Sequence, residues 1–280
     1  MTVSETRRGG PPDAVLWHDL ECGAYTADLA LWRELAGDPD RLGGPVLDLG
    51  AGTGRVALDL ARRGHEVVAL DLDETLLDAL RQRVDGLAVE VVGGDARAFA
   101  LGRTFALVLA PMQTVQLLDG TEGVRGLLRS ARHHLRPGGV LAAALAEAIP
   151  FDTPVADGRA PAGGPAVGGR TAASMPTVEP PAPDRHEVDG WIYVSLPVAV
   201  RPDPDGGGAT WLERRRETVD PTGARTWELD RVRLDALGLA DLYREAIAHG
   251  FEALAPRVVA ETEDHVASDV ALLRREAGDG

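Results

Sequence analysis

The 280-residue sequence contains no lysine and no asparagine, a single cysteine, and few aromatic residues. Lysine and asparagine both need AT-rich codons, so a GC-rich genome explains their absence. With Cys22 alone, an internal disulfide and a cysteine-cluster zinc site are excluded. No run of about 18 uncharged apolar residues occurs, which excludes a membrane-spanning helix. Residues 1–13 are polar and lack the apolar core of a signal peptide, so we expect a cytoplasmic protein.

The charge of the chain is strongly one-sided. The formal net charge is −15 at pH 7, and all 29 basic residues are arginines. An excess of negative charge repels the phosphates of nucleic acids and of anionic membranes. We therefore expect the partner to be a small molecule rather than a nucleic acid or a membrane, and the protein to be a monomer or a homodimer.

Short apolar runs alternate with helix-like segments from Pro45 to about Glu147. Uninterrupted apolar runs are typical of parallel strands that are covered on both faces. The pattern predicts an α/β fold with a doubly wound, Rossmann-like sheet. The predicted strands are Val46–Leu49, Glu66–Leu70, Ala88–Val92, Phe105–Leu109 and Val140–Ala146. This core covers residues 41–148, and it follows a disordered tail at 1–12 and an N-terminal helical cap at 13–40.

The alternation ends after the fifth strand. Residues 157–184 consist mostly of alanine, glycine and proline, which cannot form a long regular element. We predict that 149–235 is an insertion over the substrate site and that 236–280 returns to the core. The insertion would contain the antiparallel strands Trp191–Val200, Thr210–Val219 and Arg225–Leu234. The last segment would contain a helix at Leu239–His249 and two strands, near Pro256–Glu261 and at Ser268–Arg274.

The strongest motif is a glycine-rich turn between the first strand and the following helix. It reads Val-Leu-Asp-Leu-Gly-Ala-Gly-Thr-Gly from Val46 to Gly54. Glycines allow a tight turn and let a ligand approach the backbone. Asp48 lies two residues before Gly50, where its carboxylate would attract a cationic amino group and repel a pyrophosphate.

The dinucleotide fingerprint G-x-G-x-x-G is not met when it is counted from Gly50, because Arg55 replaces the third glycine. Counted from Gly52, Ala57 satisfies the looser form that ends in alanine. A nicotinamide-dependent oxidoreductase therefore remains an alternative.

Two further acids follow the next strands. Asp71 ends the second strand, where a carboxylate can accept hydrogen bonds from both hydroxyls of a ribose. Asp95 follows the third strand in Gly93-Gly94-Asp95-Ala96, where it can accept a hydrogen bond from an adenine amino group. The alternative is that these acids only cap helices or turns.

These motifs resemble those of the class I methyltransferases that depend on S-adenosylmethionine (SAM). The resemblance covers about residues 13–147, with the closing elements at 239–274 also in order. It implies a seven-stranded sheet with an N-terminal helical segment and an antiparallel β insertion after the fifth strand. The product would be S-adenosylhomocysteine (SAH). By the same resemblance the cofactor-binding residues are Asp48, Gly50, Ala51, Gly52, Gly54, Asp71, Leu72, Asp95, Ala96 and Ala110.

Among relatives, the chain resembles small-molecule methyltransferases of actinobacterial secondary metabolism, including those that methylate an indole ring. No tryptophan or tyrosine lies between residues 33 and 190. Aromatic residues from the N-terminal segment and the late strands would line an aromatic lid over a flat, apolar substrate. Alternatively, they form the core of a small sheet. The predicted substrate-contacting residues are Trp17, Trp32, Met112, Gln116, Trp191 and Tyr193.

We therefore expect C- or N-methylation of an aromatic or indole-containing natural product, with O- or N-methylation of another metabolite as the alternative. The catalytic candidates are Tyr25, Gln113, Glu147 and His18. Tyr25 is favoured because a tyrosine in the N-terminal segment often lies over the SAM methyl group in relatives. Gln113 could orient a polar group of the substrate or only cap its loop. A SAM-binding protein without catalysis remains possible, and no histidine has partners at metal-ligand spacing, so no metal is expected.

Overall fold

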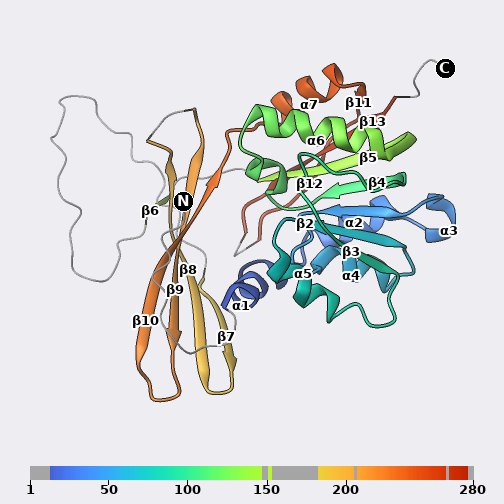
Figure 1. The fold of residues 1–280 in the computed structure, drawn as a ribbon. Helices are drawn as coiled ribbons and strands as arrows, with labels where there is room; N and C mark the ends of the chain where they lie inside the picture. The colour runs from blue at the N-terminus through green and yellow to red at the C-terminus, as the bar shows by residue number, and fades with distance from the viewer. Residues whose placement is uncertain (1–12, 147–150, 153–181, 205–206, 263–264, 277–280) are drawn as a thin grey trace, which may run out of the picture.

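The computed structural model describes residues 13–146, 151–152, 182–204, 207–262 and 265–276. Figure 1 shows two parts, an α/β part with helices on both faces of one sheet and a twisted antiparallel sheet beside it. The predicted tail at 1–12 and most of the predicted flexible segment lie outside the described residues. Within the described residues, no helix is long and apolar enough to span a membrane.

The α/β part contains the parallel strands that the apolar runs predicted. They are β1 (Val46–Leu49), β2 (Val67–Asp71), β3 (Val89–Gly93), β4 (Phe105–Ala110) and β5 (Leu135–Ala146). Three antiparallel strands complete the sheet, β11 (Phe251–Ala253), β12 (Arg257–Val259) and β13 (Ser268–Arg275). The order is β11-β13-β5-β4-β1-β2-β3, and β12 also pairs with β13. Every residue of β1 and β4 is buried, as expected of strands that are covered on both faces.

Two apolar clusters lie on opposite faces of this sheet. One joins alternate residues of β1, β2 and β4 to the helices α2 (Leu29–Ala36), α4 (Arg55–Ala61) and α5 (Glu74–Arg81). The other joins the remaining strand residues to α6 (Thr121–His134), α7 (Leu239–Ala248) and the 3₁₀ turn η2 (Thr114–Leu117). The short helix α3 (Pro39–Leu42) precedes β1. The sheet is therefore doubly wound, which confirms the predicted fold class.

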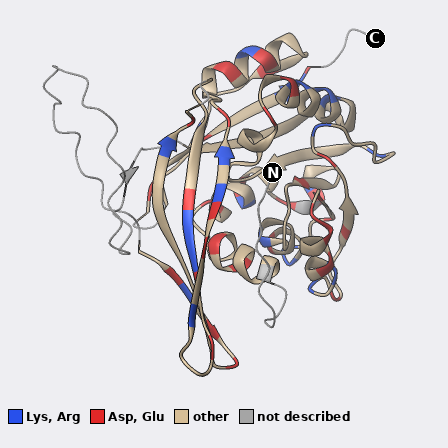
Figure 2. Cartoon of the chain, turned by 60° about the vertical axis from the view of Figure 1, so that its left-hand side comes forward, with Lys and Arg blue, Asp and Glu red and all other residues tan. Residues whose placement is uncertain are grey.

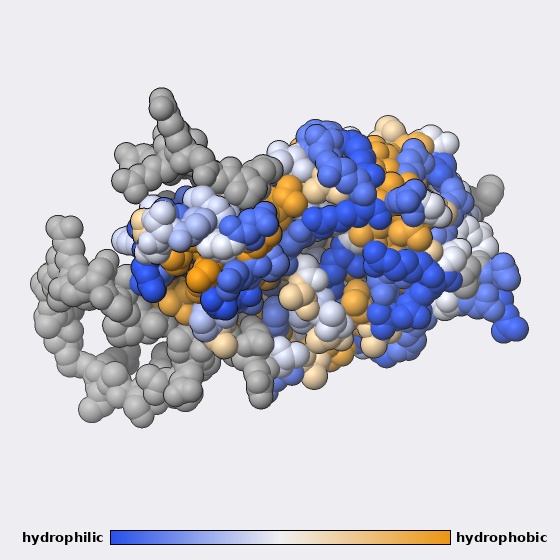
Figure 3. Space-filling model, turned by 90° about the horizontal axis from the view of Figure 1, so that it is seen from below, coloured by the Kyte–Doolittle hydropathy of each residue, from blue (hydrophilic) through white to orange (hydrophobic). Residues whose placement is uncertain are grey.

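The second sheet comes from the segment after β5. It contains β6 (Phe151–Asp152), β7 (Asp184–Val188), β8 (Trp191–Pro202), β9 (Thr210–Val219) and β10 (Arg225–Leu234), all paired antiparallel. Acidic and basic residues are distributed along its strands (Figure 2). Seen from below, the molecule is mostly hydrophilic with separate apolar patches (Figure 3).

The N-terminal segment connects the two parts. The predicted helical cap at 13–40 is divided into α1 (Asp13–His18), a π-helical turn η1 (Asp19–Gly23), α2 and the start of α3. Glu21 in η1 accepts hydrogen bonds of 2.8 and 2.7 Å from Arg216 of β9 and one of 2.7 Å from Ser195 of β8. The guanidinium of Arg216 also lies over the ring of Trp17. These contacts hold the segment against the second sheet.

Candidate active site

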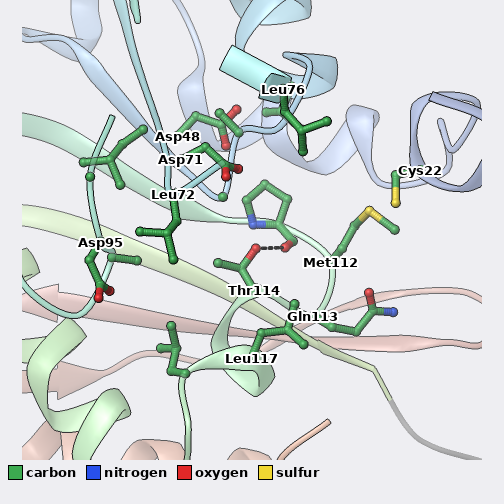
Figure 4. Close-up of a pocket in the computed structure, with 18 of the residues that line it drawn as sticks. Cys22, Asp48, Asp71, Leu72, Leu76, Asp95, Met112, Gln113, Thr114 and Leu117 are labelled. Carbon is green, nitrogen blue, oxygen red and sulfur yellow. Dashed lines mark hydrogen bonds between the residues drawn. The ribbon is translucent and has the colours of Figure 1, made fainter. Parts of the chain in front are cut away.

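A cavity of about 430 Å³ opens at the carboxyl ends of β1, β2, β3 and β4, with the N-terminal segment on its other side. This volume is within the usual range for small-molecule sites. Figure 4 shows Asp48 and Asp71 close together, with Asp95 toward one end and Cys22, Met112 and Gln113 toward the other. The carboxyl edge of a parallel sheet is where such folds bind ligands.

The glycine-rich turn forms the base of the cavity. Gly50 and Gly52 have φ angles of 67° and 53°, a left-handed conformation that side chains disfavour. A Cβ atom at Gly52 would clash with Nε2 of His18, so a side chain there would displace the imidazole. The N–H of Gly52 donates a hydrogen bond of 2.7 Å to Oδ2 of Asp71. The turn is therefore fixed to the end of β2.

Asp71 and Leu72 form the wall next to this turn. Oδ1 of Asp71 accepts a hydrogen bond of 2.9 Å from the N–H of Asp73, which orients the carboxylate. Each carboxylate oxygen has a second lone pair, so both oxygens of Asp71 can still accept from a ligand. The side chain of Leu72 is 69% exposed and lines the cavity, as an apolar platform for a flat ring would.

Asp95 has a partner that the sequence did not predict. Its carboxylate accepts hydrogen bonds from the backbone N–H and from Nε and Nη2 of Arg97, and these bonds lower the pKa of Asp95. Arg97 also pairs with Asp119 and lines the cavity. The structure thus places Asp95 and Ala96 on the cavity wall, with Asp95 bound by a neighbouring arginine.

Asp48 is the most unusual group of the cavity wall. Its side chain is buried, and neither carboxylate oxygen has a hydrogen-bond partner within the described part of the chain. Burial raises the pKa of Asp48 to about 7, although the charge of Arg55 and the nearby backbone N–H of Ala57, which forms no hydrogen bond of good geometry with it, act in the opposite direction. A buried carboxylate without a partner is costly unless a cation pairs with it. Asp48 therefore fits a ligand that brings an ammonium group.

His18 lies over the glycine-rich turn and lines the cavity. Its Nδ1 is 3.3 Å from the hydroxyl oxygen of Thr53, and that hydroxyl donates a hydrogen bond of 2.6 Å to Asp19. Arg83 holds the carboxylate of Asp19 with two further hydrogen bonds. Burial is the largest influence on His18 and lowers its pKa below 6.5.

Tyr25, the favoured catalytic candidate, is not on the cavity wall. Its ring is buried in the apolar cluster, stacks on His265 at 4.4 Å, and lies under the guanidinium of Arg55. Burial also raises the pKa of the phenol, so at neutral pH the phenol keeps its own proton and is not available as a base. The position of Tyr25 thus gives its predicted catalytic role no geometric support. Gln113 does line the cavity, and Glu147 lies outside the described residues.

Most of the predicted substrate-contacting residues also lie elsewhere. Trp32 is fully buried and donates its indole N–H to Asp28 at 2.7 Å. Gln116 is buried and bonds to the backbone N–H and C=O of Ala146 through its amide. Tyr193 is fully buried and packs edge-on against Trp17. These three side chains therefore stabilise the fold, because their polar groups or rings contact other residues in the protein interior.

Trp17 and Trp191 do not line the cavity either. Ala110 is fully buried and is not on the wall, whereas Met112 is. Gly54 stands at the start of α4, where a Cβ atom would meet Leu80. Several wall residues were not predicted from the sequence, namely Cys22, Arg55, Val56, Leu76, Arg97, Thr114, Leu117 and Asp119. Arg55 had been noted only as the residue that breaks the dinucleotide fingerprint.

Residues 46–139 match a family model described as "Methyltransferase domain". The chain is 40% identical over 97 residues to the cypemycin N-terminal methyltransferase of a Streptomyces species, covering 35% of this chain. Over 96 residues, or 34% of this chain, it is 32% identical to the dTDP-3-amino-3,4,6-trideoxy-alpha-D-glucopyranose N,N-dimethyltransferase of Streptomyces venezuelae. The chain spans 40% of the length of each of these curated relatives.

The fold as a whole is also found among solved structures. A SAM-bound amino pentose methyltransferase from Micromonospora echinaspora, involved in calicheamicin biosynthesis, aligns over 97% of this chain and 100% of its own, with a TM-score of 0.65 and 19% identity. At that identity the likeness establishes the fold, including the antiparallel sheet that follows β5. Residues 46–139 thus match a methyltransferase domain, and the chain resembles the class I SAM-dependent methyltransferases of actinobacterial small-molecule metabolism.

Proposed function

We propose that this protein transfers a methyl group from SAM to an amine nitrogen of a small natural product. The observation that carries the proposal is the unpaired, buried carboxylate of Asp48 beside the glycine-rich turn. When bound, SAM supplies a methyl group on a positively charged sulfur, which an amine lone pair accepts as the carbon–sulfur bond breaks and SAH is left.

The residues of the cavity fit the three parts of SAM. Asp48 would pair with the ammonium of the methionine part, and the turn from Gly50 would leave room for its chain. Asp71 would accept hydrogen bonds from the ribose, and Leu72 would pack against the adenine. Ala96 borders the same end, where the pair of Asp95 and Arg97 would meet the adenine edge.

An amine substrate is favoured over an indole ring by three observations. The relatives named above act, by their names, on the N-terminus of cypemycin and on amino sugars. The predicted aromatic lid is not supported, because Trp17, Trp32, Trp191 and Tyr193 do not line the cavity. The net charge of −15 also favours approach of a cationic amine over that of an anion.

We propose that His18, which lines the cavity, accepts the proton that the amine must lose. The single hydrogen of the Thr53 hydroxyl is donated to Asp19, so toward His18 this oxygen can only accept. Nδ1 of His18 therefore carries the ring hydrogen, and Nε2, which lies over Gly52, keeps its lone pair. Because burial lowers the pKa of His18, the imidazole is neutral at physiological pH.

Gln113 and Met112 lie at the end of the cavity where an acceptor would enter (Figure 4). Met112 has a φ of 53°, which holds the start of this loop in an unusual backbone conformation. The amide of Gln113 offers both a donor and an acceptor to a polar substrate. We propose that Gln113 orients the amine while the surrounding wall limits access of water.

The proposal is tested with SAM labelled by ¹³C in the methyl group and three sets of candidate acceptors. These are amino sugars and short peptides with a free amine, matched alcohols without the amine, and indole derivatives. Mass spectrometry and NMR should show ¹³C on nitrogen, with one SAH formed for each methyl transferred. Label on indole carbon or on oxygen, with none on any amine, would contradict the proposal.

A further inference from the structure

Arg55 is the first residue of α4, and only some of the N–H donors of its guanidinium form hydrogen bonds within the protein. Its side chain is 9% exposed, and it forms an ion pair with Asp28, whose side chain is 3% exposed. Nη1 donates to Oδ1 of Asp28 at 2.5 Å and to the carbonyl oxygen of Tyr25 at 2.9 Å. Nη2 donates to Oδ2 of Asp28 at 2.8 Å. Asp28 thus holds the far end of the guanidinium.

This arrangement leaves two donors of Arg55 without a partner in the described chain. A guanidinium has five N–H groups, and the three hydrogen bonds use both of those on Nη1 and one on Nη2. The N–H of Nε and the second N–H of Nη2 remain. They lie parallel on one edge of the planar group, which is the geometry that binds a carboxylate through two hydrogen bonds.

The charge of Arg55 acts on the cavity. Arg55 lines it together with Asp48 and Cys22, and its charge opposes the rise in pKa that burial causes in both of these groups. Yet Arg55 forms no hydrogen bond with Asp48, whose carboxylate has no partner in the described chain. A cation and an anion that share one cavity wall without pairing are complementary to a ligand that carries both charges.

We propose that the free edge of Arg55 binds the α-carboxylate of the SAM methionine part while Asp48 binds its α-ammonium. This inference rests on the proposed function, because it assumes that the cavity binds SAM. Asp28 is then a positioning residue that fixes the guanidinium with its free edge available. Arg55 and Asp48 would together recognise an α-amino acid group, and a nucleoside that lacks this group would not contact them.

The test compares the binding of SAH with that of 5′-methylthioadenosine, which has the adenosine and the sulfur but no amino acid group. Replacing Arg55 alone would leave the buried Asp28 unpaired, which can unfold the protein. The variant of choice is therefore Asp28→Asn/Arg55→Met, since the asparagine side chain can still accept the indole N–H of Trp32. Asp28→Asn alone measures the effect of the first change. Arg103→Met is the matched control, because Arg103 also pairs with two acids, Glu66 and Glu90, but does not line the cavity.

Calorimetry should show that Asp28→Asn/Arg55→Met weakens SAH binding by about 10–100-fold relative to Asp28→Asn, as expected for charge-assisted hydrogen bonds. Binding of 5′-methylthioadenosine should change less than about 3-fold, and Arg103→Met should affect neither ligand. An equal loss for both ligands, or no loss for SAH, would overturn the role of Arg55. Wild-type protein that binds neither ligand would instead overturn the proposed function.

Discussion

The backbone N–H of Gly52 donates a hydrogen bond of 2.7 Å to the carboxylate of Asp71. This contact joins the turn after β1 to the last residue of β2. Asp71 therefore has two functions. It shapes the glycine-rich turn, and it presents its remaining lone pairs to the cavity, where the ribose of SAM would lie.

Replacing Asp71 should weaken SAM binding more than it affects folding. Asp71→Ala removes the acceptors for the ribose and releases Gly52, so we expect a loss of about 1.5–3 kcal/mol for each charge-assisted hydrogen bond removed. The matched control is Asp73→Ala, two residues further on. Asp73 accepts hydrogen bonds from Thr75 and Leu76 at the start of α5, so its loss should cost about 1 kcal/mol of stability. Calorimetric SAM affinity that falls equally in the two variants would count against a ribose contact.

Asp48 should link the stability of the ligand-free protein to pH. Its pKa is about 7 in the folded protein and near 3.8 when unfolded, so between these values the folded state holds the additional proton. Stability from this group is present below pH 4 and is lost as the pH rises through 7, by up to about 4 kcal/mol. Asp48→Asn should thus raise the melting temperature at pH 8 and change it much less at pH 4.5.

The same substitution should weaken SAM binding, because an asparagine cannot neutralise the ammonium of the methionine part. If Asp48→Asn is more stable than wild type at pH 8 but binds SAM more weakly, then Asp48 contributes to ligand binding at the expense of stability. If melting curves at pH 8 show Asp48→Asn to be less stable than wild type, the carboxylate has a stabilising partner and is not held for a ligand.

The apolar runs of the sequence predicted β1 and β4 well, because every residue of these strands is buried and the runs are continuous. Position along the chain was a poor guide to which side chains reach the cavity. Tyr25 was predicted to face the methyl group, but its side chain is buried away from the cavity wall, whereas His18 and Cys22 line it.

The sequence also did not predict hydrogen bonds and ion pairs between residues that are far apart along the chain. The pairing of Gln116 with Ala146 joins residues 30 positions apart, and the pairing of Arg55 with Asp28 joins residues 27 positions apart. The glycine-rich turn and Asp71 were predictable because their spacing follows directly from a strand, a turn and a helix. Arg97 was not, since nothing in its local pattern distinguishes it from a solvated arginine.

Tyr25 should prove to be a packing residue. No hydrogen bond of its phenol occurs within the described structure, so Tyr25→Phe should change turnover less than about 3-fold and leave SAH affinity unaltered. Tyr25→Ala removes the ring between His265 and Arg55 and should destabilise the protein by about 3–5 kcal/mol, measured by urea unfolding. A loss of turnover greater than about 10-fold in a stable Tyr25→Phe protein would restore it as a catalytic residue.

His18 should determine the acid side of the pH–rate profile. Because burial lowers the pKa of His18, protonation of Nε2 and the resulting fall of wild-type kcat/KM should occur at a lower pH than for a free imidazole. His18→Gln should reduce kcat by about 100-fold, the lower end of general-base effects, and should remove this limb of the profile. SAH affinity is the control and should change little. A His18→Gln enzyme that retains the same acid limb would assign the proton acceptor to another group.

The central claim is that the cavity beside Asp48 and Asp71 binds SAM and not a dinucleotide. The most direct measurement is a calorimetric titration of the wild-type protein with SAH, NAD and NADP under the same conditions. We expect saturable binding of one SAH per chain and no detectable binding of NAD or NADP. Saturable binding of NAD or NADP without binding of SAH would contradict this claim.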